Sequence, residues 1–369
     1  MGQIYSGTIK PKPYVGVSKV KAIYRGIEKI WNGASAFLGV NGTAYIYKWE
    51  NADLAQITKP VQVSKVSDMT VALMSQFVIR KSDGMIVALL REGTASYYII
   101  RAYRDSLSMS TVWERADKFY TDVDSGGNML SILPFTPVDI YILNNRFYIR
   151  SDSSSGYTYH SNDGIVWRST GVDKAVKDRY MRSMEYHKGN YFTTINTSSS
   201  IMYTFNSTNW TSMTEVSVGG YVGTLKSNGE YLFGAGDFGT GNGRVSRSLT
   251  GTSDWIVTNL NQTIGTTALM ETNGGNMIAI GNHNGTIVFS KDNGVTWGIK
   301  VFPELTSNFH YCRGLTFVDG AFIFAFNSTN LGGNNQYMIK TEDFITWSMI
   351  ETTATTINRV YALKNMEGI

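Results

Sequence analysis

The stretch Ser290-Lys291-Asp292-Asn293-Gly294-Val295-Thr296-Trp297 has the form Ser-x-Asp-x-Gly-x-x-Trp and decides how the rest of the chain is interpreted. A carboxylate such as that of Asp292 caps the amides of its own turn, and Gly294 supplies a positive φ that other residues adopt at a cost. Trp297 is large enough to pin the following strand into a core. The octet therefore predicts a strand end, a tight polar turn and the start of an antiparallel strand.

Degraded copies of this octet recur along the chain. Asn162, Gly164 and Trp167 keep the polar residue, the glycine and the tryptophan of one copy, whereas Glu342 and Trp347 keep the acid and the tryptophan of another. Weaker copies end at Trp113, Trp210 and Trp255, and the successive tryptophans are 54, 43, 45, 42 and 50 residues apart. Self-similarity at about 40–50 residues is typical of β-propeller blades.

The octet resembles the Asp-box of the bacterial neuraminidase-type repeat, which occurs in sialidase-like and other β-propellers. The resemblance implies that the turn joins the third and fourth strands of a blade at the outer rim of the ring. Its residues are then structural and lie away from the usual ligand-binding face. This interpretation covers Ser290, Asp292, Gly294, Trp297, Asn162, Gly164, Trp167 and Trp347.

Strands can be assigned to six complete blades between Met69 and Ile350, among them Ser96–Tyr103, Val166–Ser169, Trp210–Met213 and Thr286–Ser290. Unpaired pieces remain at both ends. Arg359–Gly368 is expected to form an inner strand, and Ala36–Val40, Thr43–Tyr47 and Leu54–Ile57 are expected to form three more. Joining the two sets closes a seventh blade and removes two open sheet edges. We therefore predict an all-β, seven-bladed β-propeller over residues 34–369, closed by strands from both termini, with six blades as the alternative.

Composition supports an all-β chain and argues against several classes of protein. The 369 residues include 37 glycines, 6 prolines and 13% aromatic side chains, as expected for strands and tight turns. The single cysteine, Cys312, and four histidines without ligand spacing predict no disulfide framework, no metal site and no cofactor. No apolar segment predicts a signal peptide or membrane insertion, so we expect synthesis in the host cytoplasm without a leader.

The basic charge is concentrated in residues 1–33, which hold six basic side chains and one acidic side chain. The remaining 27 basic and 28 acidic side chains nearly cancel, which argues against nucleic-acid binding by the body. Residues 17–31 alternate apolar and charged positions, and Arg25-Gly26 is a candidate hairpin turn. The segment resembles the short N-terminal segments of phage tail and tail-fibre proteins, which implies docking or oligomerisation through Lys19, Lys21, Tyr24, Arg25 and Trp31.

An alternative interpretation makes this arm an amphipathic edge hairpin packed on the propeller, because a short hairpin is marginal alone in water. The arm would then lean on its own body or on a second subunit of a homo-oligomer.

The face opposite the capped turns holds the candidate ligand-binding residues. Arg182, Arg313 and Arg359 each stand at the start of a predicted inner strand, where three guanidinium groups could clamp a carboxylate or phosphate. Sialidases use such an arginine trio, but this chain lacks their Phe/Tyr-Arg-Ile-Pro motif, and salt bridges to Glu185 or Glu271 are the alternative. Polar and aromatic loop residues form the second group of candidates for sugar contact: Phe119, Tyr120, Phe135, Asp237, Phe238, Asn334 and Asn335.

These patterns together predict a non-enzymatic tail or fibre component of a phage-like virion. The arm would attach it to other virion proteins, and the loop face would bind a host-surface receptor, in the first place a glycan. The alternatives are a glycan-cleaving, sialidase-like glycoside hydrolase and a purely structural virion protein. No catalytic residue can be assigned, since the aspartates mostly lie in or beside turns, where backbone capping explains them.

Overall fold

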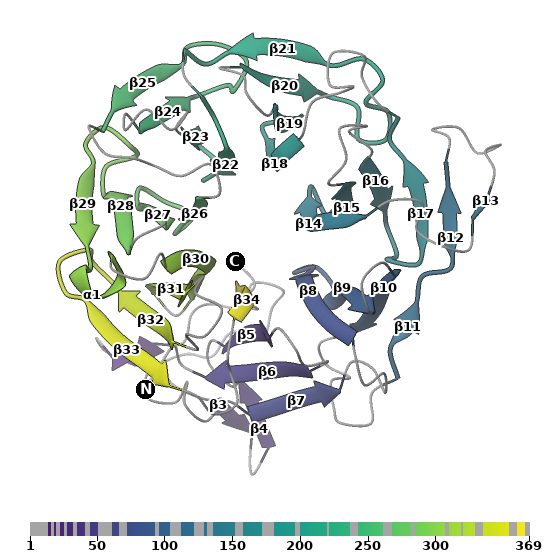
Figure 1. Cartoon of the computed structure of the whole chain (residues 1–369), viewed down its shortest axis with the longest axis horizontal. Coiled ribbons are helices and arrows are strands. Elements are labelled where there is room, and N and C mark those ends of the chain that lie inside the picture. The colour runs from purple at the N-terminus through teal and green to yellow at the C-terminus, as the bar shows by residue number, and fades with distance from the viewer. Residues whose placement is uncertain are drawn as a thin grey trace.

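The computed structural model shows sheets arranged radially around a central axis, so the prediction of an all-β propeller is confirmed (Figure 1). The structure describes residues 14–15, 18–19, 23–25, 28–31, 35–40, 45–50, 61–65, 72–92, 96–103, 112–121, 129–130, 136–151, 158–171, 181–195, 200–219, 221–236, 243–260, 268–281, 285–306, 310–318, 320–328, 335–353 and 360–365.

In the described ranges, six blades each contain four successive antiparallel strands, ordered from the axis outward. The first three blades are β8 (Ala72–Ile79), β9 (Met85–Glu92), β10 (Ser96–Tyr103) and β11 (Glu114–Arg115); β14 (Pro137–Leu143), β15 (Arg146–Ser151), β16 (Thr158–Ser161) and β17 (Val166–Ser169); and β18 (Met181–His187), β19 (Asn190–Ile195), β20 (Ser200–Thr204) and β21 (Thr214–Ser217).

The next three blades continue the same pattern, with one helical turn, α1 (Pro303–Thr306), between the second and the third of them. They are β22 (Thr224–Ser227), β23 (Leu232–Gly236), β24 (Arg244–Ser248) and β25 (Ile256–Asn259); β26 (Leu269–Thr272), β27 (Ile278–Gly281), β28 (Thr286–Ser290) and β29 (Gly298–Val301); and β30 (His310–Val318), β31 (Ala321–Ser328), β32 (Asn335–Thr341) and β33 (Ser348–Thr353).

A further four-stranded sheet joins the two ends of the chain. Its order is β34 (Val360–Asn365), β5 (Ser35–Val40), β6 (Tyr45–Glu50) and β7 (Val61–Lys65), and β34 lies beside the inner strands β30 and β8. The outermost strand was predicted at Leu54–Ile57, which lies outside the described residues, and β7 takes the outer place of the sheet. The stretch Val61-Gln-Val-Ser-Lys65 alternates β-branched and polar residues and is the better strand.

The basic arm contains two small hairpins. β1 (Tyr14–Val15) pairs with β2 (Ser18–Lys19), and β3 (Ile23–Arg25) pairs with β4 (Glu28–Trp31). The second hairpin agrees with the predicted turn, because Arg25 lies opposite Glu28. Lys19, Tyr24, Arg25 and Trp31 therefore fall in these strands, whereas Lys21 lies outside the described residues.

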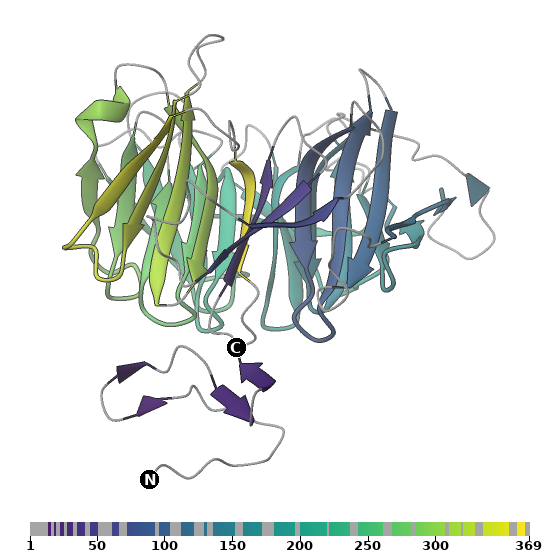
Figure 2. The same ribbon diagram turned by 90° about the horizontal axis from the view of Figure 1, so that it is seen from below.

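Two ends of the ring can be distinguished from the strand directions. The turn end is where the third and fourth strands of each blade are joined, and the loop end is where the inner strands begin. Because β5 is a second strand, its first residue, Ser35, lies at the turn end. Figure 2 shows β1–β4 beyond that end, opposite to α1.

The segment after β11 contributes two strands that were predicted to be a loop. β12 (Lys118–Tyr120) adds in parallel to β17, so that Phe119 lies opposite Trp167, and β13 (Met129–Leu130) extends the sheet outward. Phe119 is 2% exposed and belongs to the core between the first two blades. The prediction that Phe119 is a ligand-stacking residue is therefore wrong, because its ring is used to cover the outer edge of the blade.

Hydroxyl and carboxylate side chains cap the turn between β28 and β29. Ser290 Oγ accepts hydrogen bonds from the Gly294 amide at 2.8 Å and the Asp292 amide at 3.3 Å. Asp292 Oδ1 accepts the Thr296 amide at 2.9 Å, and Trp297 Nε1 donates to the Gly294 carbonyl at 3.2 Å. Gly294 has φ +72°, as the sequence predicts.

The same design recurs in the turn between β16 and β17 with different residues from those predicted. Ser161 Oγ accepts the Gly164 amide at 2.9 Å, and Asp163 Oδ1 accepts the Ile165 and Val166 amides, both at 2.9 Å. Asn162 does not cap the turn; its Oδ1 accepts Arg146 Nε instead.

The turn between β32 and β33 shows the same one-residue slip. Asp343 Oδ1 accepts the Ile345 and Thr346 amides at 2.8 Å, and Thr341 Oγ1 accepts the Phe344 amide. Asp343 therefore takes the position that was assigned to Glu342. Both slips occur because these turns are one residue shorter than Ser290–Trp297, so that the acid and the glycine position are adjacent.

Where such a turn has a positive-φ residue, that residue packs against the preceding blade. A Cβ at Gly294 would lie 3.1 Å from Phe233 Cε1, and one at Gly251 would lie 2.5 Å from Phe192 Cζ. In the last of these turns Phe344, at φ 58°, takes the glycine position and stacks on Phe289 with ring centroids 4.7 Å apart. The turns are thus contact points between successive blades.

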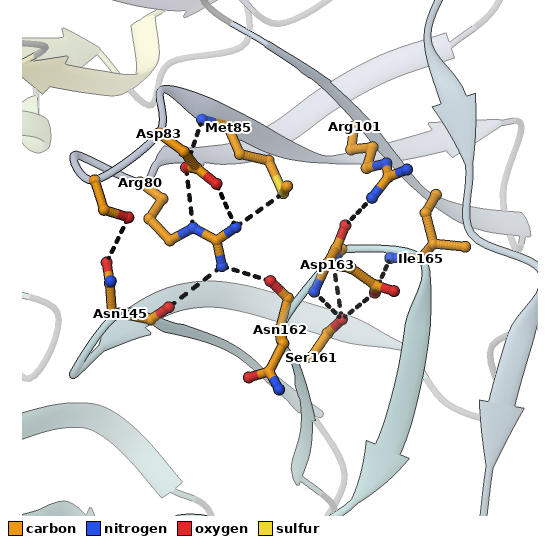
Figure 3. Close-up of polar contacts among 11 residues, drawn as sticks. Arg80, Asp83, Met85, Arg101, Asn145, Ser161, Asn162, Asp163 and Ile165 are labelled. Carbon is orange, nitrogen blue, oxygen red and sulfur yellow. Dashed lines mark hydrogen bonds and ion pairs between the residues drawn. The ribbon is translucent and has the colours of Figure 1, made fainter.

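Polar side chains of one blade also donate hydrogen bonds to turn carbonyls of the next. Arg80 Nη1 donates to the Asn162 carbonyl at 2.5 Å, and Arg101 Nη1 donates to the Asp163 carbonyl at 2.6 Å (Figure 3). Later junctions use three different donors: Tyr148 Oη to Ser207, Lys188 Nζ to Leu249, and Arg247 Nη1 to Asn293. We call these contacts inter-blade latches.

Replacing Ser290 with alanine is expected to lower the free energy of unfolding by about 1–3 kcal/mol, because two turn amides lose their buried acceptor. The measurement is chemical denaturation of S290A and the unmodified chain. Ser212→Ala is the matched control, since Ser212 is exposed and is expected to change stability by less than about 0.5 kcal/mol. Equal effects of the two substitutions would contradict a capping role for Ser290.

Candidate ligand-binding face

The predicted arginine trio is only partly placed by the structure. Arg182 lies in an irregular segment of β18 between Met181 and Met184, and Arg313 lies in the corresponding segment of β30 between Cys312 and Gly314. Both positions are at the loop end, as predicted. The inner strands β22 and β26 separate them around the ring, and Arg359 falls outside the described residues.

The Arg313 side chain is exposed and lies beside an aromatic ring. Its guanidinium carbon is 5.2 Å from the Tyr311 ring centroid, within the range of a cation–π contact. A guanidinium group held on a ring face keeps its N–H edge free for a planar acceptor such as a carboxylate. Arg313 is therefore the member of the trio whose surroundings fit ligand binding.

The predicted loop residues divide into three groups. Tyr120 is half-buried in β12 with Arg168 over its ring at 4.3 Å, and it belongs to a blade edge instead of the loop end. Asn335 begins β32 opposite Thr353, at the loop end. The remaining residues, Phe135, Asp237, Phe238 and Asn334, lie outside the described residues.

A charged group on three successive inner strands was missed by the sequence analysis. Lys226 of β22 lies 2.9 Å from Glu271 Oε1 of β26, and Glu185 of β18 is on the other side of Lys226. Lys226 thus takes the acidic partners that were considered for the arginines. The sequence offers no pattern that reveals this group, because neighbouring members are more than 40 positions apart.

The three side chains depend on one another electrostatically. Burial raises the pKa of Glu185 above its ordinary value, although the charge of Lys226 opposes this shift. The pKa of Lys226 is also raised, because the attraction of Glu271 and Glu185 exceeds the effect of burial. Lys226 is therefore positively charged at neutral pH and holds two carboxyl groups between neighbouring blades.

A second polar pair lies on the inner strand β14. Tyr141 Oη donates to Asp139 Oδ2 at 2.8 Å, and Asp139 Oδ1 accepts the Ile140 amide at 3.0 Å. Burial and the Asp139 charge both raise the pKa of Tyr141. The phenol is therefore neutral and serves as a hydrogen-bond donor to the carboxylate.

The described residues contain no cluster of histidine, cysteine, aspartate or glutamate that could hold a metal ion. They also contain no helix with the length and apolar character needed to cross a membrane.

No protein-family model and no curated protein matches the chain. Among solved structures, a candidate 6-phosphogluconolactonase from Bacteroides uniformis has a TM-score of 0.56 at 10% identity, covering 90% of this chain and 99% of its own. YCF48 bound to a D1 peptide has a TM-score of 0.51 at 15% identity, covering 80% of this chain and 87% of its own. At these identities the likeness establishes the β-propeller fold alone.

Replacing Lys226 with methionine is expected to lower the free energy of unfolding by about 1–3 kcal/mol at pH 7, because half-buried Glu271 loses its counter-ion. The difference in the free energy of unfolding between K226M and the unmodified chain should become smaller toward pH 4. Burial already raises the pKa of Glu185, and loss of the Lys226 charge raises it further, so protonation of this carboxyl removes uncompensated charge there.

The measurement is urea denaturation of K226M at several pH values. Lys118→Met is the control, since Lys118 is exposed on β12. A loss of stability independent of pH would show that Lys226 acts through packing of its aliphatic stem and not through charge.

Proposed function

We propose that the protein is a non-enzymatic component of a phage-like tail or fibre that binds a host-surface glycan through its loop end. Residues 1–33 attach it to a neighbouring virion protein. The observation that carries this proposal is that the arm joins the propeller at the turn end, whereas Arg313 and Arg182 stand at the loop end. Attachment and recognition therefore use opposite ends of one axis.

The charge distribution supports an attachment role for the arm. Residues 1–33 carry six basic side chains and one acidic side chain, whereas the rest of the chain has 27 basic and 28 acidic side chains. Two- to four-residue strands such as β1–β4 bury little surface and gain stability from a partner. A partner surface with negative charge would fit this arm.

The loop end offers chemistry suited to an acidic sugar. The exposed guanidinium of Arg313 beside Tyr311 fits a carboxylate next to a sugar face. The likeness of Ser290–Trp297 to the Asp-box supports a fold shared with sialidase-like propellers, and a glycan-cleaving enzyme is the second candidate because two arginines share the loop end.

The test combines a glycan array with a hydrolysis assay on the full chain. We expect binding to glycans that carry a carboxylate, and Arg313→Gln should lower the affinity at least tenfold. Arg115→Gln should leave the affinity unchanged, because Arg115 is an exposed residue of the outer strand β11. Release of free sugar that R313Q abolishes would establish the enzyme instead. Absence of glycan binding would leave a structural virion role.

The arm is tested separately by deleting residues 1–33. Particles are purified from cells that supply either the intact or the truncated chain. Immunoblotting should detect the intact chain in its particles and no truncated chain in the others. The truncated protein should retain glycan binding. Equal incorporation of the two forms would refute attachment through the arm.

We also propose that the β34-β5-β6-β7 sheet acts as a seventh blade that closes the ring. Its support is the pairing of Leu363 with Leu38 and the position of β34 between β30 and β8. Closure of this kind ties the two chain ends together and covers the inner edge of β5 with β34.

Cysteines placed at Leu38 and Leu363 are expected to form a disulfide on mild oxidation, seen as a mass loss of about two hydrogens, and to raise the melting temperature. The control pairs Leu363→Cys with Tyr47→Cys, which lies one strand further out, opposite Leu38. Failure of L38C/L363C to cross-link, or equal cross-linking of both pairs, would refute the closure.

A further inference from the structure

Four side chains form a row across one face of the blade β14–β17. Tyr148 of β15 lies opposite His160 of β16, His160 lies opposite Arg168 of β17, and Arg168 lies opposite Tyr120 of β12. Directly opposite residues point to the same face of a sheet, so the four side chains are neighbours. Arg146 is two residues before Tyr148 on the same strand and shares this face.

Two buried nitrogen atoms in this row have no hydrogen-bond partner. They are His160 Nδ1 and Arg168 Nη1, and the His160 side chain belongs to a residue that is only 8% exposed. Buried polar groups without partners are exceptions in folded proteins and call for an explanation. Here the two atoms belong to residues that face each other across β16 and β17.

The row also carries uncompensated positive charge. Arg168 lies over the Tyr120 ring with its guanidinium carbon 4.3 Å from the centroid, and no carboxylate of the described residues forms an ion pair with it. Arg146 donates to the neutral acceptors Asn162 Oδ1 at 2.8 Å and Ser207 Oγ at 3.1 Å. Burial and these two arginines lower the pKa of His160 to about 4, so its ring is neutral at pH 7.

The neighbouring blade borders the same row. Trp210 stacks on Tyr148 with ring centroids 5.4 Å apart, and Tyr148 Oη donates to the Ser207 carbonyl at 2.7 Å. The row therefore lies at the junction of two blades, where a bound group would contact a latch. Arg146 and Arg168 are each half-buried, so part of each side chain is in contact with solvent.

We propose that this row, Tyr120, Arg146, Tyr148, His160 and Arg168, binds a small oxyanion, either a carboxylate or a phosphate. The anion accepts hydrogen bonds from Arg168 Nη1 and from an Nδ1–H of His160, and Arg146 contributes a second positive charge. The Tyr120 ring holds the Arg168 guanidinium flat, which leaves its N–H edge for a bidentate acceptor. The site is distinct from the loop end and does not depend on the proposed glycan recognition.

A water molecule would satisfy the two nitrogen atoms but would leave both arginines without a counter-ion. An anion accounts for both observations, because it accepts hydrogen bonds from the two nitrogen atoms and neutralises the charge of the arginines. Binding at this junction should also stabilise the fold, because a ligand that binds only the folded chain shifts the unfolding equilibrium.

The experiment titrates full-length, histidine-labelled protein with sodium phosphate, sodium sulfate and sodium acetate at pH 7 and constant ionic strength. The readouts are the His160 Cε1–Hε1 NMR signal, assigned with His160→Gln, and the melting temperature. We expect a saturable shift of that signal and a rise in melting temperature with at least one of the oxyanions. Comparing the affinities for phosphate and acetate distinguishes a phosphoryl ligand from a carboxylate.

Arg168→Gln should weaken binding at least tenfold, and Arg168→Lys, which keeps the charge but loses the bidentate edge, should weaken it less. Arg244→Gln, an exposed arginine of β24 that donates to the Gly219 carbonyl, is the matched control and should bind normally. A linear, unsaturable response would overturn the proposal in favour of bound water. So would an equal response in R168K and R168Q that matches the unmodified chain.

Discussion

The hydrogen bond from a side chain of one blade to a turn carbonyl of the next is the interaction on which the ring depends. A tight turn directs some of its carbonyls away from its own sheet, so that they need a donor from elsewhere. Arg80, Tyr148, Lys188 and Arg247 supply that donor at four successive junctions. The donors are two arginines, one tyrosine and one lysine, so the turn carbonyl is the constant element and the donor side chain varies.

The latches explain why the turn sequences tolerate so much variation. The capping hydroxyl and acid change register between Ser290–Trp297 and Ser161–Trp167, yet Trp297 Nε1 and Trp167 Nε1 both donate to the carbonyl of the turn glycine. What is kept is a turn that presents a carbonyl and a flat, side-chain-free surface to the preceding blade. Where glycine is replaced by Phe344, stacking on Phe289 takes over that contact. The junction therefore survives a change from polar to aromatic chemistry.

Local patterns predicted the blades well, because each strand is bounded by its own turn residues. The bounds of Ser96–Tyr103, Val166–Ser169 and Thr286–Ser290 agree with β10, β17 and β28. The strand predicted from Trp210 instead begins at Thr214, since Asn206 caps the intervening turn through the Thr208 and Asn209 amides. Parallel addition of β12 to β17 joins residues almost 50 positions apart, and no local period reports such a pairing.

The candidate sites were harder to predict than the fold, because their chemistry is assembled from separate blades. The predicted starts of the inner strands gave the position of Arg182 and Arg313 at the loop end. No sequence pattern indicated that Lys226 pairs with Glu271. The row of Tyr148, His160 and Arg168 was likewise invisible, since it requires the register of three strands.

A propeller places its inner strands side by side and its outer strands apart, so each part of a blade has a different electrostatic task. Near the axis, Lys226 meets Glu271 of the adjacent blade directly, and charge is balanced within the protein. Toward the rim, the sheets diverge, and Arg146 reaches only the neutral acceptors Asn162 of its own blade and Ser207 of the next. Positive charge that is not balanced by a neighbouring blade attracts anions from solvent. The divergence of the blades thus gives a physical reason for ligand sites at their outer junctions as well as at the loop end.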